Sequence, residues 1–173
     1  MSKRVIRGTY GSKNISQIIT ELNAYKQELL QKEKRLLEGL AELGYREASI
    51  RFVTAIYDGI NDVSVSLEGK NNRYVIRAEG KAVAFIEFGT GVYHNTGEPY
   101  PLPRPDGVVG IGEYGDGKGK RSAWYYKGEP GSNGTQTKGG VVKTKGNPAA
   151  MPMWYASEEM KNSVLKVARE VFK

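Results

Sequence analysis

Glycine and proline are concentrated between residues 89 and 150, and this uneven distribution constrains the fold more than any other feature of the chain. Fifteen of the 22 glycines and six of the seven prolines lie there. In a helix interior, glycine costs about 1 kcal/mol and proline about 3 kcal/mol relative to alanine, so this stretch cannot be mostly helical. We therefore expect one domain of three parts: an α+β body at 1–88, an extended loop or arm at 89–150, and a C-terminal helix at 151–173 that completes the body.

Helical periodicity dominates the first third of the chain. Asn14 begins a helix-start pattern, and apolar residues follow at helical spacing over residues 15–43. This pattern predicts one long amphipathic helix. After Gly44 the apolar residues again recur at helical spacing over 45–57, until an Asp-Gly pair interrupts them. The sequence therefore predicts a second helix, joined to the first through a glycine.

The apolar period then changes from helical to alternating. Apolar and polar residues alternate over 63–68, which is typical of a strand with one buried face. A Gly-Lys-Asn-Asn turn follows at 69–72, and the β-rich segment 74–78 comes next. These features predict a small antiparallel sheet.

A short helix is predicted at the border between the body and the arm. Ala82, Phe85, Ile86 and Gly89 are spaced as one apolar helix face, and Gly89 suits the left-handed conformation that ends a helix. A strand with two buried faces is the alternative interpretation.

Within the arm, residues 107–111 and 122–127 are candidate strands on either side of a glycine-rich tip at 115–120. Residues 140–143 are a further candidate strand that we expect to pair with 122–127, so we expect a β-hairpin excursion. Residues 101–150 carry eight Lys and Arg against four Asp and Glu, so the basic excess behind the +7 net charge lies mainly in this glycine-rich segment and near the N-terminus.

The last helix is predicted to begin at Ser157. This serine is a favourable N-cap, acidic residues follow it, and apolar residues then recur on one face to the end of the chain.

The chain has few residues that support catalysis or metal binding. It contains no cysteine, and His94 is its only histidine. A Gly-x-Gly-x-x-Gly match at 110–115 lacks the following helix that a dinucleotide site requires. We expect no catalytic residues, no metal and no cofactor. The N-terminus has no signal-peptide pattern and no segment is apolar enough for a membrane span, so we expect no membrane association.

A mixture of cationic and aromatic residues in the arm is the best candidate for ligand contact, because cations bind phosphates and aromatic rings stack on bases. The alternatives are a hairpin whose aromatic rings pack inward and a surface that contacts another protein. The residues are Lys118, Lys120, Arg121, Trp124, Tyr125, Tyr126 and Lys127.

Two separated motifs resemble a family of tail-component or neck proteins of long-tailed bacteriophages. Residues 85–91, FIEFGTG, resemble the family's E-F-G-T signature. Residues 146–156, GNPAAMPMWYA, resemble its later P-A-x-P-F element that leads into the last helix, with Met153-Trp154 in place of the usual aromatic residue after proline. The order and the spacing of the two motifs also agree with the family.

This resemblance implies a structural virion protein that joins the head connector to the tail and has no catalytic residues. It implies a homo-oligomeric ring of six or twelve copies, assembled in the host cytoplasm. The expected partners are head connector or portal-side proteins and tail terminator or tail-tube proteins, with possible contact to packaged DNA. Glu87 is interpreted as a fold or interface carboxylate. The implied fold and interface residues are Phe85, Glu87, Phe88, Gly89, Thr90, Pro148, Pro152 and Trp154.

Overall fold

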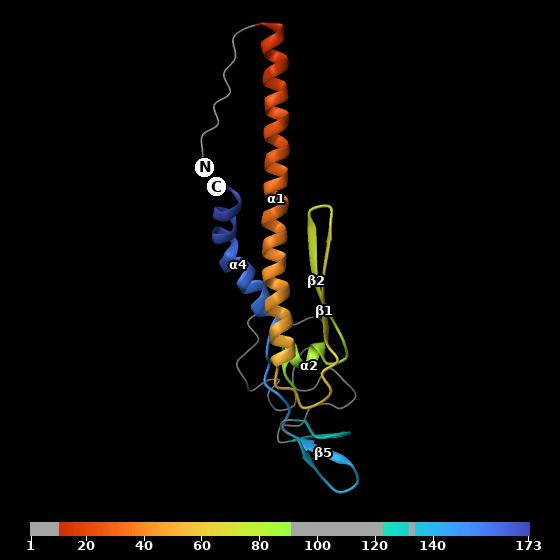
Figure 1. The fold of residues 1–173 in the computed structure, drawn as a ribbon. Helices are drawn as coiled ribbons and strands as arrows, with labels where there is room; N and C mark the ends of the chain where they lie inside the picture. The colour runs from red at the N-terminus through yellow and green to blue at the C-terminus, as the bar shows by residue number, and fades with distance from the viewer. Residues whose placement is uncertain (1–10, 91–122, 132–133) are drawn as a thin grey trace.

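The computed structural model describes residues 11–90, 123–131 and 134–173, and within them the fold is α+β as expected. A long helix forms the axis, and the C-terminal helix and a β-hairpin lie along it (Figure 1). A second, three-stranded sheet lies beyond the C-terminal end of the long helix. The elements are α1 Ser12–Thr54, β1 Ser64–Lys70, β2 Arg73–Glu79, α2 Val83–Phe88, β3 Trp124–Lys127, β4 Thr135–Gln136, β5 Val141–Thr144 and α4 Pro152–Val171.

The predicted break at Gly44 is wrong, because α1 continues through it as a single helix of 43 residues. A Cβ atom at Gly44 would lie 2.6 Å from Sδ of Met160 and 2.8 Å from Cδ1 of Ile76. Met160 belongs to α4 and Ile76 to β2, so both elements approach the α1 backbone at this position. Gly44 is therefore a close-packing residue inside a helix rather than a helix end.

The hairpin forms as predicted. Strands β1 and β2 pair antiparallel, with Lys70 opposite Arg73. Asn71 and Asn72 connect them with φ angles of 52° and 57°. Two consecutive left-handed residues are typical of the type I′ turn that matches the twist of a tight hairpin.

Helix α2 confirms the predicted short helix and rejects the strand alternative. It spans six residues and ends at Gly89. Its buried face contributes Ile86, which packs with Phe52 of α1 and Ala82 in the hydrophobic core. Met153 of α4 packs against the same cluster, so this core joins three helices.

The second sheet has the strand order β3-β5-β4, and both of its strand pairs are antiparallel. The predicted pairing of residues 122–127 with 140–143 is confirmed by the β3–β5 ladder, in which Tyr126 lies opposite Val142. Val142 is fully buried. The candidate strand at 107–111 and the tip at 115–120 lie outside the described residues.

Helix α4 begins at Pro152, in agreement with the expected C-terminal helix at 151–173, whereas the predicted N-cap at Ser157 is wrong because Ser157 lies inside the helix. It packs along α1, where the guanidinium of Arg51 lies 3.7 Å from the centre of the Tyr155 ring. A proline is favourable in the first turn of a helix because no intrahelical partner is needed for a backbone N–H there. None of the described helices combines the length and the apolar character needed to cross a membrane.

Candidate functional site

The carboxylate of Glu87, at the end of α2, binds the N-terminus of α4. Its Oε2 accepts a hydrogen bond from the backbone N–H of Met153 at 2.9 Å, and its Oε1 accepts one from Trp154 at 3.1 Å. The side chain is only 4% exposed. The first N–H groups of a helix have no intrahelical acceptors and carry partial positive charge, so a buried carboxylate is a suitable partner for them.

Helix α4 cannot obtain this cap from its own first residues. Its N-cap residue is Met151, whose thioether chain forms no cap hydrogen bond and whose backbone has a left-handed φ of 51°. The next residue, Pro152, has no N–H to donate. Glu87 therefore supplies, from a distant position in the sequence, the acceptor that Ser, Thr or Asp usually supplies at a helix start.

Backbone hydrogen bonds extend this joint on both sides. The N–H of Ala150 donates to the carbonyl of Ile86 at 2.9 Å, which satisfies an acceptor near the end of α2. The N–H of Thr90 donates to the carbonyl of Asn147 at 2.8 Å, and the N–H of Asn147 donates to Oγ1 of Thr90, also at 2.8 Å. The two motifs singled out in the sequence thus form one hydrogen-bonded unit, which we call the motif joint (residues 85–90 and 146–154).

Gly89 allows the two segments to approach this closely. Its backbone has φ 76° and ψ 172°, a region that is open almost only to glycine. A Cβ atom there would lie 2.8 Å from the nitrogen of Ala149 and 2.9 Å from the carbonyl oxygen of Asn147. The prediction of a left-handed conformation at Gly89 is therefore correct only for the positive φ, because a ψ of 172° lies outside the left-handed helical region. Gly89 also permits the close contact between the two backbones.

The other predicted signature residues lie around the motif joint. Phe88 and Pro152 are buried, whereas Pro148 is exposed. The half-buried Trp154 packs edge-on against Tyr155, with ring centroids 4.7 Å apart. Phe85 lines a cavity of about 390 Å³ between the α1–β1 loop and the second sheet. Among these, Phe88 and Pro152 are therefore the signature side chains that are buried at the joint.

Asp62 holds the turn that leads into α2, and the sequence analysis missed it. Its Oδ2 and Oδ1 accept hydrogen bonds from the N–H groups of Lys81 and Ala82, both at 2.9 Å. These two donors hold the pKa of Asp62 below its usual range. The only sequence signal is a lone acidic residue in a loop, and nothing local indicates that its partner lies about 20 residues away.

Asp58 and Tyr126 connect the body to the second sheet. Asp58 is 7% exposed, and its Oδ1 accepts a hydrogen bond from the Tyr126 hydroxyl at 3.3 Å. The same hydroxyl lies 3.1 Å from the carbonyl oxygen of Glu129 and accepts from the N–H of Gly131 at 3.3 Å. Burial raises the pKa of Tyr126 and that of neighbouring Tyr57, and the Asp58 charge adds to both shifts, so both phenols stay protonated at neutral pH.

The structure describes only some of the cationic and aromatic arm residues, and these do not all face the same way. Lys118, Lys120 and Arg121 lie outside the described residues, as does His94. The backbone of Trp124 pairs with Thr144 in the sheet. Tyr126 points inward to Asp58, whereas Tyr125 is 51% exposed and Lys127 is exposed. Lys143, on β5, lies directly opposite Tyr125 and is also exposed.

The contacts described at these sites are helix caps, hydrogen bonds and side-chain packing. Within residues 11–90, 123–131 and 134–173, no group of three acidic, histidine or cysteine side chains is able to hold a metal ion. The buried carboxylate of Glu87 accepts hydrogen bonds from two helix amides. This arrangement supports a structural role for the motif joint.

Comparisons of the chain with protein-family models, with curated proteins and with solved structures find no match.

Removing the Glu87 cap tests the motif joint. We expect Glu87→Ala to lower the free energy of unfolding by about 3 kcal/mol, because two buried helix amides lose a charged acceptor. Glu87→Gln keeps one acceptor oxygen, and we expect roughly half that loss. The control is Glu170→Ala, an exposed glutamate on α4, which should change the stability by less than about 0.5 kcal/mol. Urea unfolding followed by circular dichroism measures all three. Equal stability of Glu87→Ala and Glu170→Ala would contradict the cap.

Adjacent tyrosines provide a matched test of the link between the body and the second sheet. Tyr126→Phe removes a hydroxyl that contacts Asp58, Glu129 and Gly131, and we expect a loss of about 1–2 kcal/mol in urea unfolding. Tyr125→Phe removes the same atom from an outward-facing ring and should cost less than about 0.5 kcal/mol. If the two variants have the same stability, the inward hydroxyl does not hold the sheet.

Proposed function

We propose that this chain is a structural subunit of a bacteriophage neck, which forms a homo-oligomeric ring and joins the head connector to the tail. The observation that carries the proposal is the motif joint. The two motifs that resemble the neck family are separated by more than 50 residues, yet their backbones are hydrogen-bonded to each other. This arrangement is what a shared fold signature requires, since motifs preserved for folding have to meet in space.

The buried position of the motif joint supports a structural rather than a catalytic role. Glu87 is the carboxylate of the E-F-G-T motif, and both of its oxygens accept from backbone amides. A carboxylate that is occupied in this way is poorly placed to exchange protons with a substrate. We propose that the motif acts by fixing where the arm leaves the body and where it returns.

Exposed apolar side chains near the C-terminal end of α1 also support a role in assembly. Ile56 is 61% exposed and Ile60 is 87% exposed, and Val53 beside them is 79% exposed. These three exposed apolar residues lie close together in the sequence, and exposed apolar patches are typical of protein contact sites. We propose that this end of the body contacts another protein of the assembly, either a ring neighbour or a connector or tail protein.

Native mass spectrometry of the full chain, alone and with candidate connector and tail-tube proteins, tests the proposal. We expect a ring of six or twelve copies that binds at least one of these partners. A complementary test is electron microscopy of particles made without this protein, which should contain filled heads that lack joined tails. Joined, complete particles in its absence would overturn the proposed function.

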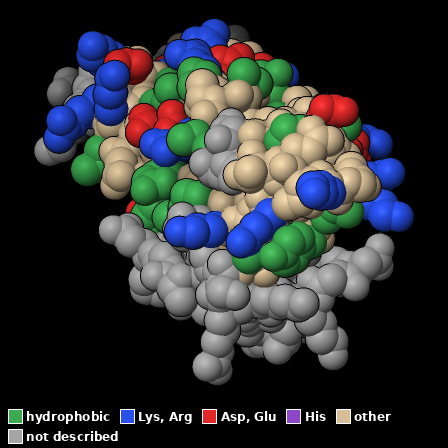
Figure 2. Space-filling model, turned by 90° about the horizontal axis from the view of Figure 1, so that it is seen from below, with side chains coloured by type: hydrophobic (Ala, Val, Ile, Leu, Met, Phe, Trp, Pro, Cys, Tyr) green, Lys and Arg blue, Asp and Glu red, His purple; other side chains and the backbone are tan. Residues whose placement is uncertain are grey.

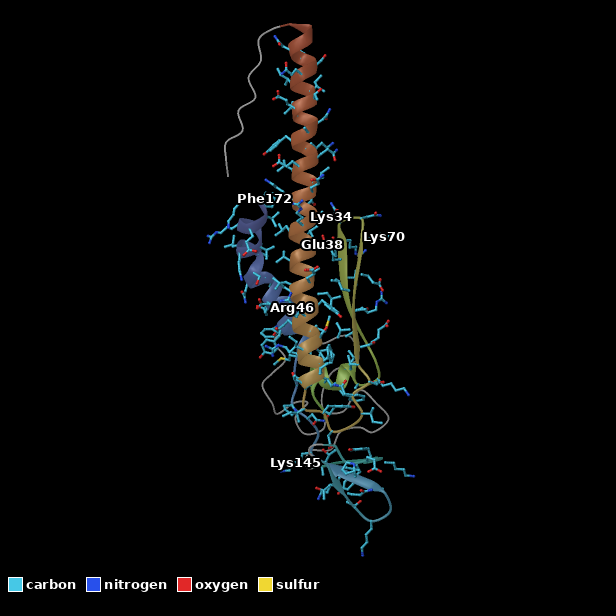
Figure 3. All side chains as sticks on the ribbon, viewed as in Figure 1. Lys34, Glu38, Arg46, Lys70, Lys145 and Phe172 are labelled. Atoms are coloured by element: carbon cyan, nitrogen blue, oxygen red, sulfur yellow. The ribbon has the colours of Figure 1, made fainter. Side chains whose placement is uncertain are left out.

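A second candidate function is nucleic-acid binding, and the outer face of the second sheet favours it. Tyr125 and Lys127 share that face of β3, and Lys143 lies opposite Tyr125 on β5. Viewed from this end of the molecule, Lys and Arg side chains lie beside hydrophobic ones (Figure 2). Lys145 follows directly at the end of β5 (Figure 3). An exposed aromatic ring among lysines suits contact with a base and its phosphates.

Salt-dependent binding tests this second candidate. We expect the chain to bind a DNA oligonucleotide in fluorescence anisotropy, most tightly at low salt. Lys143→Ala should reduce the salt slope of log K by about 1, because one phosphate contact is lost. Lys166→Ala removes the same charge from the exposed surface of α4 and should leave the slope unchanged. Absence of binding at low salt, or equal effects of the two variants, would reject this function.

A further inference from the structure

The N-terminal half of α1 extends beyond the elements that pack on the rest of this helix (Figure 1). Residues 12–31 make up about 30 Å of helix at 1.5 Å per residue. The end of α4 reaches α1 at Lys32, whose ammonium group lies 6.0 Å from the centre of the Phe172 ring. On the other side, the tip of the β1–β2 hairpin at Lys70 reaches Lys34 (Figure 3). Helices of this length are marginal in water without a packing partner.

One face of this protruding segment has a coiled-coil pattern. Ile15, Leu22 and Leu29 recur every seven residues, and their side chains are 52%, 50% and 37% exposed. Ile18 lies between the first two, so together they follow the a and d positions of a heptad repeat. The exposed apolar stripe is therefore regular, and we call it the α1 stripe (Ile15, Ile18, Leu22 and Leu29).

The α1 stripe continues a helix interface that already exists within the chain. The same heptad register extends to Leu36 and Leu43, which are half-buried. At the intervening d position, a Cβ atom on Gly39 would lie 3.3 Å from Cγ1 of Val167 in α4. From Lys32 towards the C-terminal end of α1, α4 thus covers this face of the helix. On the N-terminal side of Lys32, no element of the described part of the chain covers it.

We propose that the α1 stripe packs against the α1 stripe of a second copy of this chain, with the two helices parallel and in register. Charge supports this choice of partner and direction. In the heptad register Glu21 is at g and Lys26 is at the following e position. In a parallel pair, g of one helix faces the next e of its partner, so Glu21 of each copy faces Lys26 of the other.

An antiparallel pair lacks this complementarity. Antiparallel helices place g opposite g, and the g positions of the segment include the glutamates Glu21 and Glu28. In the parallel pair one unfavourable match remains, between Glu28 and Glu33, although Glu28 already pairs with Lys32 of its own helix at 3.0 Å. The Glu28–Glu33 repulsion lies where α4 begins to cover the apolar face of α1. We therefore place the end of the coiled coil near Leu29.

This inference goes beyond the proposed neck function and does not depend on it. A contact between identical stripes uses the same surface on both copies and closes as a pair, so it is distinct from the heterologous contact that would close the proposed ring. If the chain self-associates through α1 but binds no connector or tail protein, the contact stands and the neck function fails. If the chain binds those proteins but does not self-associate through α1, the neck function stands and the α1 contact fails.

Cysteine cross-linking tests both the contact and its direction, because the natural chain contains no cysteine. We expect Ile15→Cys and Leu29→Cys, each alone in the full chain, to form covalent dimers on mild oxidation. Gln27→Cys, on the opposite helix face, is the control and should remain mostly monomeric on a denaturing gel. Cross-linking only in a mixture of Ile15→Cys with Leu29→Cys would show an antiparallel pair and overturn the proposed direction.

Sedimentation equilibrium of charge variants provides an independent measure of the contact. We expect Leu22→Glu to weaken self-association by about tenfold or more, since a buried apolar side chain is replaced by a charge. Gln27→Glu adds the same charge on the opposite face and should have little effect. Glu21→Lys and Lys26→Glu should each weaken association, and the double variant should restore it. A strictly monomeric natural chain, or equal effects of Leu22→Glu and Gln27→Glu, would overturn the proposal.

Discussion

The hydrogen bonds between the Glu87 carboxylate and the first amides of α4 are the interaction on which the rest of the structure depends. They fix the end of α2 against the start of α4, and α4 in turn packs along α1 beside the core at Phe52 and Ile86. A buried carboxylate is costly without partners, so its two helix amides make the correct arrangement much more favourable than any other. The motif joint therefore determines both the path of the chain and the position of its last helix.

This joint also explains how the body carries a long glycine-rich segment. Residues 91–145 leave from Thr90 and return near Asn147, and these two residues are hydrogen-bonded to each other. The entropic cost of closing a loop grows only slowly with its length, so a joint that holds the two ends together tolerates a long insertion between them. Asp58 and Tyr126 then hold the second sheet to the body. We propose that this design presents a rigid body to one set of contacts and the outer face of the sheet to another.

Local patterns predicted the elements well, whereas contacts between distant residues were not predictable. The alternation at 63–68 and the helical spacing of Ala82, Phe85 and Ile86 gave β1 and α2, because periodicity is a property of neighbouring residues. The predicted helix end at Gly44 is wrong. A glycine that ends a helix and a glycine that leaves room for a neighbouring side chain, here Met160, cannot be told apart from the sequence. The sequence predicts a cap at Ser157 because the residue that caps α4, Glu87, lies 66 residues before Met153 and no local pattern indicates it. Glu87 was identified as a structural carboxylate, but its partners were not.

Native-state hydrogen exchange at the amides of Met153 and Trp154 tests the central claim most directly. Amides in the first turn of a helix usually exchange rapidly, because they have no acceptor within the helix. The Glu87 cap predicts that these two amides exchange only on global unfolding, as slowly as the amide of Ile86 in the core. Exchange of Met153 and Trp154 as rapid as that of the first-turn amides of α1 would contradict the cap, and with it the account of how the two motifs are joined.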